Sequence, residues 1–339
     1  MTTIKEIAEL AGVSTTTVSN VIHGKTKKVS PATIHKVESL IKELGYVQKM
    51  GLRVLNKESS QLIAVVINYH KEFRDSILGD PFYGKLIGFI EELVQKHGYY
   101  LMIYTAQNIE NIFQMVMGWN IDGVIAISFS RKNCDKIYQL IKKPIVSIDA
   151  YGERDQEITG HVVNIALDDE SGGYEMTRYL LSLGYKNIKV CAGRDNGVDH
   201  QRLIGANRAL KEHNGSDRTL QFIVLGMNAA KRRESYQWLL QRKQENTALF
   251  FLSDAYALEA ISLYSDLGVS IPQDIGIVGF DDISYAEVSV PKLTTVKQDV
   301  YQKAKKAVDV LMEEIQSKTV PDESINISLP ISLIKRNSV

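Results

Sequence analysis

The chain beyond position 61 alternates short apolar runs with longer amphipathic stretches, and this alternation restricts the possible folds strongly. We expect β-strands in eight apolar runs, at 62–67, 100–105, 123–128, 144–149, 187–192, 222–226, 248–252 and 275–280. Helices are expected between them, for example at 83–97, 171–183 and 201–213. Strands that are apolar throughout and alternate with helices form parallel sheets covered on both faces. Because eight or more strands exceed one comfortable sheet, the pattern predicts an α/β core of two doubly wound lobes.

Sheets of this kind bind ligands at the carboxyl ends of their strands, so we expect a cleft between the lobes. The sequence contains no H-E-x-x-H or G-x-S-x-G, and no G-x-G-x-x-G follows the first strand. Gly24-Lys25-Thr26 resembles the end of a phosphate-binding loop, but no strand precedes it. The run Asp168-Asp169-Glu170 is most simply the start of a helix at Ser171, where acids suit the helix dipole. We therefore expect a binding protein with no catalytic role, metal or cofactor.

The first 47 residues have a different pattern, typical of three short helices. Thr3-Ile4-Lys5-Glu6 fits a capping box, and Gly12 breaks the helix that follows it. Ser14 is a suitable cap for a second helix. A third helix is expected to begin at Ser30-Pro31 and to end at Gly45. Two short helices joined by a tight turn form a helix-turn-helix.

The exposed face of the second helix favours a role on DNA. It carries short hydroxyls and an amide at Thr15, Thr16, Ser19 and Asn20. Small polar side chains let a helix enter the major groove and contact base edges and phosphates. Positions 1–57 hold nine Lys and Arg against four acids, a net of +5, although the whole chain balances at 40 each. A basic head suits a phosphate backbone. The alternative on these grounds is a small helical bundle with an ordinary solvated face.

The stretch TIKEIAELAGVSTTTVSNVIHGK, followed by VSPATIHKVESLIKELGY, resembles the head of the lactose-repressor (LacI/GalR) family of transcription regulators. It carries the pattern A-x-x-A-G-V-S-x-x-T-V-S-x-V-I without a gap. The loop at 24–28 looks one residue longer than is usual in that family. The DNA-binding residues implied for the head are Thr15, Thr16 and Asn20 at base-reading positions, Ser14, Thr17, Ser19 and His23 at supporting or phosphate-contacting positions, and Ile4 and Lys28 on the same surface.

The resemblance implies that positions 48–60 are a hinge helix and linker. Family members pair this segment in the minor groove, where a leucine is wedged into the central base step, and Leu55 aligns with that leucine. Lys49 and Leu52 are assigned to the same surface, although they replace the usual asparagine and alanine. Whether Leu52 adds a second apolar contact is open. The segment is too short and glycine-weakened to form a stable helix alone.

The resemblance continues more loosely through the core. Similar segments are DPFYGKLIGFIEEL, MGWNIDGVIAI, DDESGGYEMTRYLLSLGY and IPQDIGIVGFDDI…PKLTTVKQD. Family cores fold like periplasmic sugar-binding proteins, with three crossings between the lobes. That implies an N-lobe of about 61–161 and 300–327 and a C-lobe of about 162–299 and 328–339. LPISLIKRNSV matches the family's last strand with no leucine-heptad tail after it, which implies a homodimer rather than a tetramer.

The resemblance places Asp149, Arg202 and Asp281 in the cleft. Ionised aspartates accept hydrogen bonds from vicinal hydroxyls, and arginine donates a fork to a ring oxygen and a hydroxyl together. Phe82 and Tyr83 are suited to stack on the apolar face of a ring. The expected effector is therefore a carbohydrate, a sugar or sugar derivative. A nucleoside-type corepressor and control by a protein partner are the alternatives.

The full set of residues assigned to the effector site is Phe82, Tyr83, Asp149, Arg202, Ser253, Asp254, Asp281 and Gln298. Some of them have another possible role: Arg202 or Asp281 as a salt bridge between the lobes, and Phe82 as part of the core. Ser253 stands where many relatives carry asparagine, and Ala229-Ala230 stand where a sugar pocket commonly has an aromatic residue. The sequence therefore does not identify the sugar.

These features together predict a sequence-specific DNA-binding regulator, and repression is the commoner outcome in the family. Its operator is expected to be a pseudo-palindrome of double-stranded DNA. The chain lacks a secretory signal and a run of about 18 apolar residues, so we expect a cytoplasmic protein that does not enter a membrane. Cys134 and Cys191 lie far apart, which argues against a disulfide framework or a zinc site.

Overall fold

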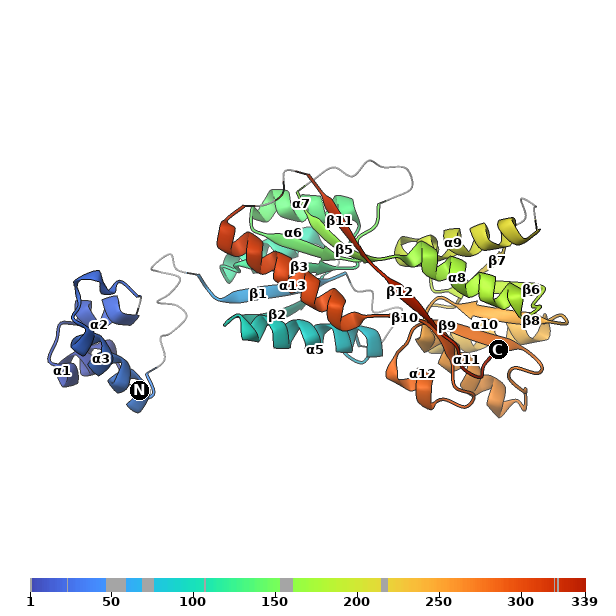
Figure 1. The fold of residues 1–339 in the computed structure, drawn as a ribbon, viewed down its shortest axis with the longest axis horizontal. Helices are drawn as coiled ribbons and strands as arrows, with labels where there is room; N and C mark the ends of the chain where they lie inside the picture. Colours follow the sequence, from blue (N-terminus) through green and yellow to red (C-terminus); the bar gives the residue numbers. More distant parts are fainter. Residues whose placement is uncertain are drawn as a thin grey trace. The chain divides into compact units, whose positions relative to one another are not determined.

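The computed structural model describes residues 2–22, 24–46, 59–68, 76–106, 108–152, 161–214, 219–319, 321 and 323–339. The chain separates into two compact units, Met1–Ser60 and Gln61–Val339 (Figure 1). The first unit is helical, and the second is a mixed α/β body with two parallel-sheet lobes. This division agrees with the expected fold class of a helical head and a two-lobed core.

The helices of the first unit are α1 (Ile4–Ala11), α2 (Thr15–Ile22), the short 3₁₀ helix η1 (Thr26–Lys28) and α3 (Pro31–Glu43). The capping box of α1 is present: the Thr3 hydroxyl accepts from the Glu6 N–H, and the Glu6 carboxylate accepts from the Thr3 N–H. Gly12 then ends α1 in the left-handed conformation, at φ 69°. The three helices predicted from capping signals are thus confirmed.

A small apolar cluster holds the head together. Its buried members are Ile7, Ala8, Ala11, Val18, Val21 and Val37. They come from all three α-helices, so each helix contributes one face to the same core. Burying one Ile or Val side chain stabilises a fold by about 1.5–3 kcal/mol. Lys36 on α3 also donates to the carbonyl oxygen of Ala11 at 2.9 Å, which fixes the end of α1 beside α3.

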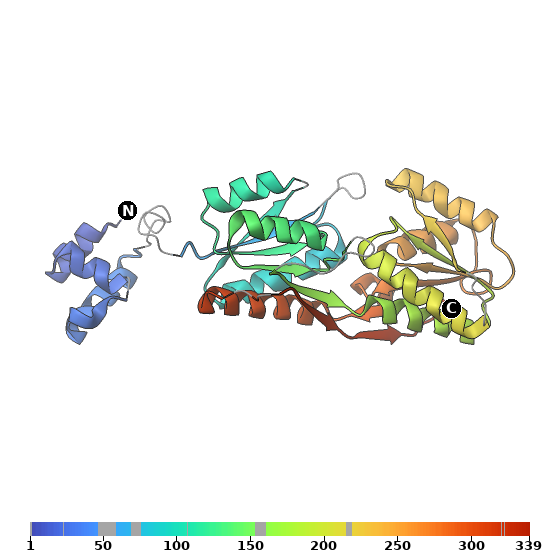
Figure 2. The same ribbon diagram turned by 90° about the horizontal axis from the view of Figure 1, so that it is seen from above.

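The first lobe of the second unit contains a six-stranded sheet in the order β11-β5-β4-β3-β1-β2. Its strands are β1 (Leu62–Ile67), β2 (Tyr100–Thr105), β3 (Gly123–Ile127), β4 (Ile145–Ile148), β5 (Val163–Leu167) and β11 (Ile325–Leu329). All neighbouring pairs are parallel. Two apolar clusters lie on opposite faces of the sheet. One contains α5 (Pro81–Lys96) and α13 (Val300–Ser317), and the other α6 (Ile109–Gly118) and α7 (Arg131–Ile141) (Figure 2).

The second lobe repeats this plan in the order β12-β10-β9-β8-β6-β7. Its strands are β6 (Asn187–Ala192), β7 (Gln221–Val224), β8 (Thr247–Phe251), β9 (Gly276–Asp281), β10 (Thr294–Gln298) and β12 (Ile331–Ile334). The pairs are parallel except β10 with β12. Its helices are α8 (Asp169–Ser182), α9 (Gly197–Asn214), α10 (Ala229–Gln241), α11 (Asp254–Asp266) and the short α12 (Ser284–Val288). The chain passes between the lobes from β5 to α8, from β10 to α13 and from β11 to β12.

Four strands are additional to the eight expected runs, namely β5, β10, β11 and β12, of which the family resemblance had pointed only to the last. Two of them, β5 and β10, carry buried polar residues. In β5 the amide of Asn164 is buried and bonds to the N–H and carbonyl of Ala150. In β10 the hydroxyl of Thr294 accepts from the Arg336 N–H. Because β5 and β11 belong to the first sheet, that sheet extends to Leu167 and Leu329. The expected lobe limits of 161 and 327 are corrected accordingly.

Among the described helices, none combines the length and the apolar character that crossing a membrane requires.

Candidate functional site

The exposed surface of α2 carries small neutral side chains. Thr15 and Thr16 are exposed, and Ser19 and Asn20 are partly buried, whereas Val18 on the same helix lies in the head core. Ser14 caps α2, because its hydroxyl oxygen accepts from the Thr17 N–H at 3.0 Å and lies 2.9 Å from the Thr17 hydroxyl. The cap fixes where α2 begins and therefore how this face is presented.

The other residues assigned to DNA binding are placed differently. Lys28 is exposed at the end of η1, while the side chain of Ile4 is partly buried against the head core. The assigned residues outside the described part of the chain are His23, Lys49, Leu52 and Leu55. The DNA contacts of all these residues stay predictions.

A cavity of about 1150 Å³ lies in the second unit and is lined by both lobes. Residues that end or follow strands contribute to it, as expected for parallel sheets: Asn68, Ser128, Asp149, Gly193, Leu252 and Asp281. Seven of the eight residues assigned to the effector site line this cavity: Phe82, Tyr83, Asp149, Arg202, Ser253, Asp281 and Gln298. The structure thus brings them together, and their contact with an effector stays a prediction.

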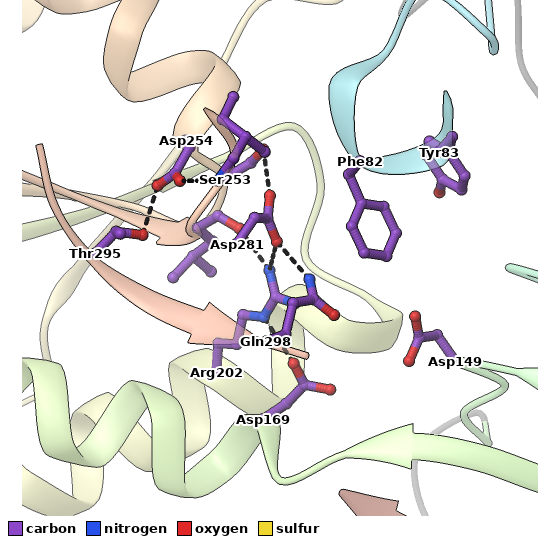
Figure 3. Close-up of polar contacts among 12 residues, drawn as sticks. Phe82, Tyr83, Asp149, Asp169, Arg202, Ser253, Asp254, Asp281, Thr295 and Gln298 are labelled. Atoms are coloured by element: carbon purple, nitrogen blue, oxygen red, sulfur yellow. Dashed lines mark hydrogen bonds and ion pairs between the residues drawn. The ribbon is translucent and has the colours of Figure 1, made fainter. Parts of the chain in front are cut away.

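Asp281 is the centre of the hydrogen bonds on the C-lobe side (Figure 3). One carboxylate oxygen accepts from the Ser253 hydroxyl at 3.1 Å, and the other accepts from the Gln298 amide at 2.7 Å. The latter oxygen lies 3.9 Å from a guanidinium nitrogen of Arg202. Asp281 therefore connects the end of β9 with the end of β10, the strand from which the chain crosses to the other lobe.

Arg202 on α9 is 5 % exposed and makes several contacts within the C-lobe. Its Nε donates to Asp169 at 2.8 Å and another nitrogen donates to the Leu252 carbonyl at 2.6 Å, while its guanidinium carbon lies 3.6 Å from the centre of the Phe280 ring. Burial opposes the charge, but Asp169 and Asp281 outweigh it and raise the pKa of Arg202. Because these partners come from α8 and β9, the ion pairs that Arg202 makes with described residues lie within the C-lobe, which contradicts the alternative of a salt bridge between the lobes for Arg202.

Two glycines hold Arg202 against Asp169. A side-chain carbon at Gly173 on α8 would overlap the carbonyl oxygen of Arg202, and one at Gly205 on α9 would overlap that of Glu170. Glycine at both positions therefore lets the backbones of α8 and α9 come close together. The ion pair sits at the end of this close contact, next to the cavity.

On the other side of the cavity, Lys303 organises the polar groups. Its Nζ donates to both oxygens of Asp149 at 2.9 Å and to the side-chain amide oxygen of Gln298 at 2.8 Å. Burial raises the pKa of Asp149, and Lys303 opposes that rise. Gln298 thus bonds to Asp281 through its nitrogen and to Lys303 through its oxygen. Arg202, Asp281, Gln298, Lys303 and Asp149 form one continuous chain of polar contacts, which we call the interlobe chain.

The aromatic residues are on the N-lobe side, at the start of α5 (Figure 3). The rings of Phe82 and Tyr83 meet edge to face at 5.3 Å, and the Tyr83 hydroxyl lies 2.8 Å from that of Ser128. Lys303 Nζ is 5.6 Å from the centre of the Phe82 ring. Phe82 lines the cavity and also packs partly against the lobe's core, so its two proposed roles are compatible.

Asp254 is the one assigned effector residue that does not line the cavity. It is fully buried, and its two oxygens accept from the Thr295 hydroxyl at 2.6 Å and from the Ile283 N–H at 3.0 Å. Burial, reinforced by Asp281, raises its pKa well above the ordinary value. We correct its assignment: Asp254 ties α11 to β10 and the segment after β9.

Sequence reasoning missed three residues at this site, namely Tyr151, Asp169 and Lys303. Only Asp168 of the acidic run caps α8, through the Ser171 N–H, and the helix begins at Asp169 rather than Ser171. Asp169 itself is 2 % exposed and accepts from the Tyr151 hydroxyl as well as from Arg202. Burial and Asp169 raise the pKa of Tyr151. The available signal was position, because Asp169 lies two residues after the end of β5, the strand that leads into the second lobe.

A second hollow, of about 800 Å³, lies along α10, α11 and α12. Ala229 and Ala230 line this hollow and not the cavity. Its lining includes Leu258, Leu263 and Val288, and none of the interlobe chain. The cavity between the lobes is therefore the stronger candidate for a polar ligand.

A helix-turn-helix head followed by a two-lobed α/β core with a polar cavity defines the class of ligand-responsive DNA-binding regulators. Residues 3–49 match bacterial regulatory proteins of the lacI family, and residues 177–339 match the periplasmic binding protein-like domain. The HTH-type transcriptional regulator MalR of Clostridium butyricum is 30% identical, over 99% of this chain and 98% of its own. The HTH-type transcriptional repressor PurR of Aliivibrio salmonicida is 31% identical, over 94% of this chain and 93% of its own.

Solved structures agree with this fold. The lac repressor dimer bound to operator and the anti-inducer ONPF has a TM-score of 0.81 at 24% identity, covering 99% of this chain and 98% of that one. The complex of the transcriptional regulator CelR with cellobiose has a TM-score of 0.70 at 25% identity and covers 100% of both chains. The chain belongs to the LacI family of bacterial transcription regulators. The families it matches are regulators and binding proteins, not enzymes.

Proposed function

We propose that this protein is a transcription repressor whose affinity for its operator is switched by a sugar or sugar derivative bound in the interlobe cavity. The observation that carries the proposal is the interlobe chain, which runs without a break from Arg202 in one lobe to Asp149 in the other. A ligand that donates hydroxyls to these carboxylates contacts both lobes at once. It therefore favours one lobe arrangement over another.

The DNA-binding part of the proposal rests on α2. Two heads of a homodimer read the two half-sites of a pseudo-palindrome with Thr15, Thr16 and Asn20, whose small side chains fit the major groove. The relatives named as repressors and the lac repressor dimer on its operator support this arrangement. The family's usual outcome, repression, is adopted for this chain.

The switch follows from linkage between the two sites. An effector changes operator affinity only by its differential affinity for the two lobe arrangements. The three segments that pass between the lobes, β5 to α8, β10 to α13 and β11 to β12, are where a change of arrangement must be absorbed. Gln298 and Lys303 flank the second of these segments, so a ligand that contacts the interlobe chain acts directly at it.

The first experiment selects the operator and then the effector. An unbiased oligonucleotide selection with the full-length protein yields the preferred sequence, and fluorescence anisotropy then measures operator affinity with added neutral sugars or nucleosides. We expect one or more sugars to change operator affinity by about fivefold or more. The absence of any oligonucleotide preference would contradict the DNA-binding role. A response to nucleosides alone would identify the effector as a nucleoside-type corepressor and not a sugar.

A pair of lysine variants tests the cavity. Lys303→Met removes the buried cation of the interlobe chain, whereas Lys306→Met changes an exposed lysine on the same helix. We expect Lys303→Met to abolish the response to the effector while operator binding persists, and Lys306→Met to behave like the unchanged protein. An intact response in Lys303→Met would show that the switch does not use this chain of contacts.

Leu55→Ala tests the hinge predicted from the sequence. Without an apolar wedge in the central base step, operator DNA is expected to bend less and specific affinity to fall, while non-specific affinity stays nearly constant. Gel phasing of operator fragments measures the bend. An unchanged bend angle would refute the assignment of Leu55.

A further inference from the structure

The cavity contains more acidic than basic groups around its polar contacts. Asp149, Asp169, Asp199 and Asp281 all line it, whereas the cations that pair with members of this group are Arg202 and Lys303. Four carboxylates against two cations give a net charge of −2 when all are ionised. The remaining charged lining residues do not reverse this sign: Asp80, Asp168, Glu170, Asp195, Arg131, Arg194 and His200.

Lys303 has all of its donor protons matched by protein acceptors, and Arg202 uses two of its donors within the protein. The three protons of the Lys303 ammonium group match three acceptors, the two oxygens of Asp149 and that of Gln298. Arg202 donates to Asp169 and to the Leu252 carbonyl, and its face packs on Phe280. A phosphate or carboxylate entering the cavity would compete with these partners for the cations and would meet the excess of carboxylates.

Asp199 differs from the other three aspartates. The described residues supply hydrogen bonds to the carboxylates of Asp149, Asp169 and Asp281, but none to that of Asp199. Burial raises its pKa to about 7; Arg202 and Arg194 oppose this rise. Asp199 lies in the first turn of α9, where an acid also suits the helix dipole. Asp199 is also one of the residues that line the cavity.

We propose that the effector carries a positively charged amine, as an amino sugar does, and that the Asp199 carboxylate accepts its ammonium protons. This inference rests on the proposed function, because it names the chemical class of ligand for the same cavity. An ammonium group supplies the donors that the described residues do not give to Asp199, and it offsets part of the excess negative charge. The hydroxyls of the same ligand then bond to acceptors of the interlobe chain such as Asp149 and Asp281.

Matched sugars of different charge test the inference. Isothermal titration at pH 7 compares D-glucosamine and D-galactosamine with D-glucose, D-galactose and the two 6-phosphates, using the full-length protein. We expect an amino sugar to bind about tenfold more tightly than its neutral parent, since a hydrogen bond to a charged group contributes about 1.4 kcal/mol or more. The sugar phosphates are expected to bind more weakly than either.

Two variants on the same helix assign the effect. Asp199→Asn keeps the size of the side chain and removes its charge, so the preference for the amine should disappear, while an unchanged affinity for the neutral parent sugar shows that the cavity is intact. Glu212→Gln removes an exposed acid near the other end of α9 and should keep the preference. A preference that survives in Asp199→Asn would overturn the role of Asp199.

The outcomes separate this inference from the proposed function. Neutral sugars that bind as tightly as amino sugars and change operator affinity would overturn the amine and leave the sugar-controlled repressor intact. If a sugar phosphate binds more tightly than an amino sugar, the argument from the negative charge of the cavity is overturned and the sugar-controlled repressor is left intact. If no sugar of any charge binds and a nucleoside does, both the inference and the sugar effector are overturned.

Discussion

The polar face of α2 and the polar lining of the cavity differ in how far their groups are already satisfied within the protein. On α2 the outward side chains are short and neutral, and Thr15 and Thr16 are exposed. In the cavity the principal groups are charged and buried, and Arg202 and Lys303 each hold a carboxylate at 2.8–2.9 Å. The first surface can exchange water for a partner, whereas the second is largely committed to itself.

This difference has consequences for what each site can respond to. Exposed groups on a basic head read DNA through contacts that the surrounding salt screens. Buried pairs are shielded from salt, but removing one partner leaves the other charge without compensation in a poorly solvated place. Raising the ionic strength should therefore weaken DNA binding by the head more than effector binding in the cavity. Removing one charge should be more costly in the cavity than on the head.

The largest difference between the two sites is expected in how operator affinity and effector affinity respond to ionic strength. Raising salt from about 50 to 200 mM is expected to lower operator affinity by about a thousandfold or more, if about six or more phosphates are contacted. Effector affinity, measured by titration calorimetry over the same range, should change by less than about twofold, because the pairs around the cavity are buried. A flat salt response for the operator would contradict the phosphate contacts of the head.

The second-largest effect is expected when one buried charge of the cavity is removed. Arg202→Ala leaves Asp169 and Asp281 without their cation, and breaking a buried pair typically costs about 3–5 kcal/mol. Urea unfolding of the core should therefore shift strongly. Arg208→Ala is the matched control on the same helix, since its ion pair with Glu170 is partly exposed and such pairs contribute less than about 1 kcal/mol.

The same pair of variants separates structure from binding. Arg202→Ala should also lose the response to the effector while the head still binds operator, because the helices of the head have their own core. Equal unfolding midpoints for the two variants would show that the Arg202 pairs stabilise no more than a surface ion pair does.

The head was predictable from the sequence because its signals are local. A capping box, a glycine at the end of α1 and a Ser-Pro start of α3 each act within a few residues, and all three appear where expected. The apolar strands were predictable for the same reason. The strands β5 and β10 were missed because their polar residues, such as Asn164 and Thr294, are satisfied by distant partners.

The cavity was only partly predictable. Family resemblance pointed to Asp149, Arg202 and Asp281, which do line it. Lys303 was missed because, in the sequence, it looks like Lys305 and Lys306 on the same helix. Only the contact of α13 with the end of β4 makes it a buried ion-pair partner. Pairing of this kind is set by tertiary structure, which a helical pattern does not encode.

A smaller effect is expected at a single base-reading side chain. Asn20→Ala should weaken binding to the selected operator by about 1–3 kcal/mol and leave affinity for unrelated DNA nearly unchanged, since an amide bonded to a base edge contributes specificity of that size. Ser39→Ala, at an exposed position on α3, is the control and should change neither. Anisotropy titrations with operator and scrambled duplexes measure both. An equal loss on both duplexes would identify Asn20 as a phosphate contact instead.

The smallest effect is expected from a change of pH, which should alter affinity for an amino sugar through the ionisation of Asp199. With its pKa raised to about 7 by burial, the free carboxyl is mostly protonated at pH 5.5 and half ionised at pH 7. Arg202 and Arg194 favour the ionised form, whereas Asp281 and Asp169 disfavour it. An amine with a pKa of about 8 stays charged over this range. Affinity for an amino sugar should therefore rise about fifteenfold from pH 5.5 to pH 7, because the ionised fraction of Asp199 grows by roughly that factor.

Asp199→Asn should remove most of this pH dependence, and the neutral parent sugar should show little of it even in the unchanged protein. Operator binding through α2 should not follow the same curve, because the neutral side chains of that face do not titrate in this range. Calorimetric titrations at four pH values, with both sugars and both proteins, separate these cases. An amino sugar that binds more tightly at pH 5.5 than at pH 7 would mean that a protonated, neutral Asp199 is the form that accepts the ligand, and the cavity would then favour hydroxyls over ammonium groups.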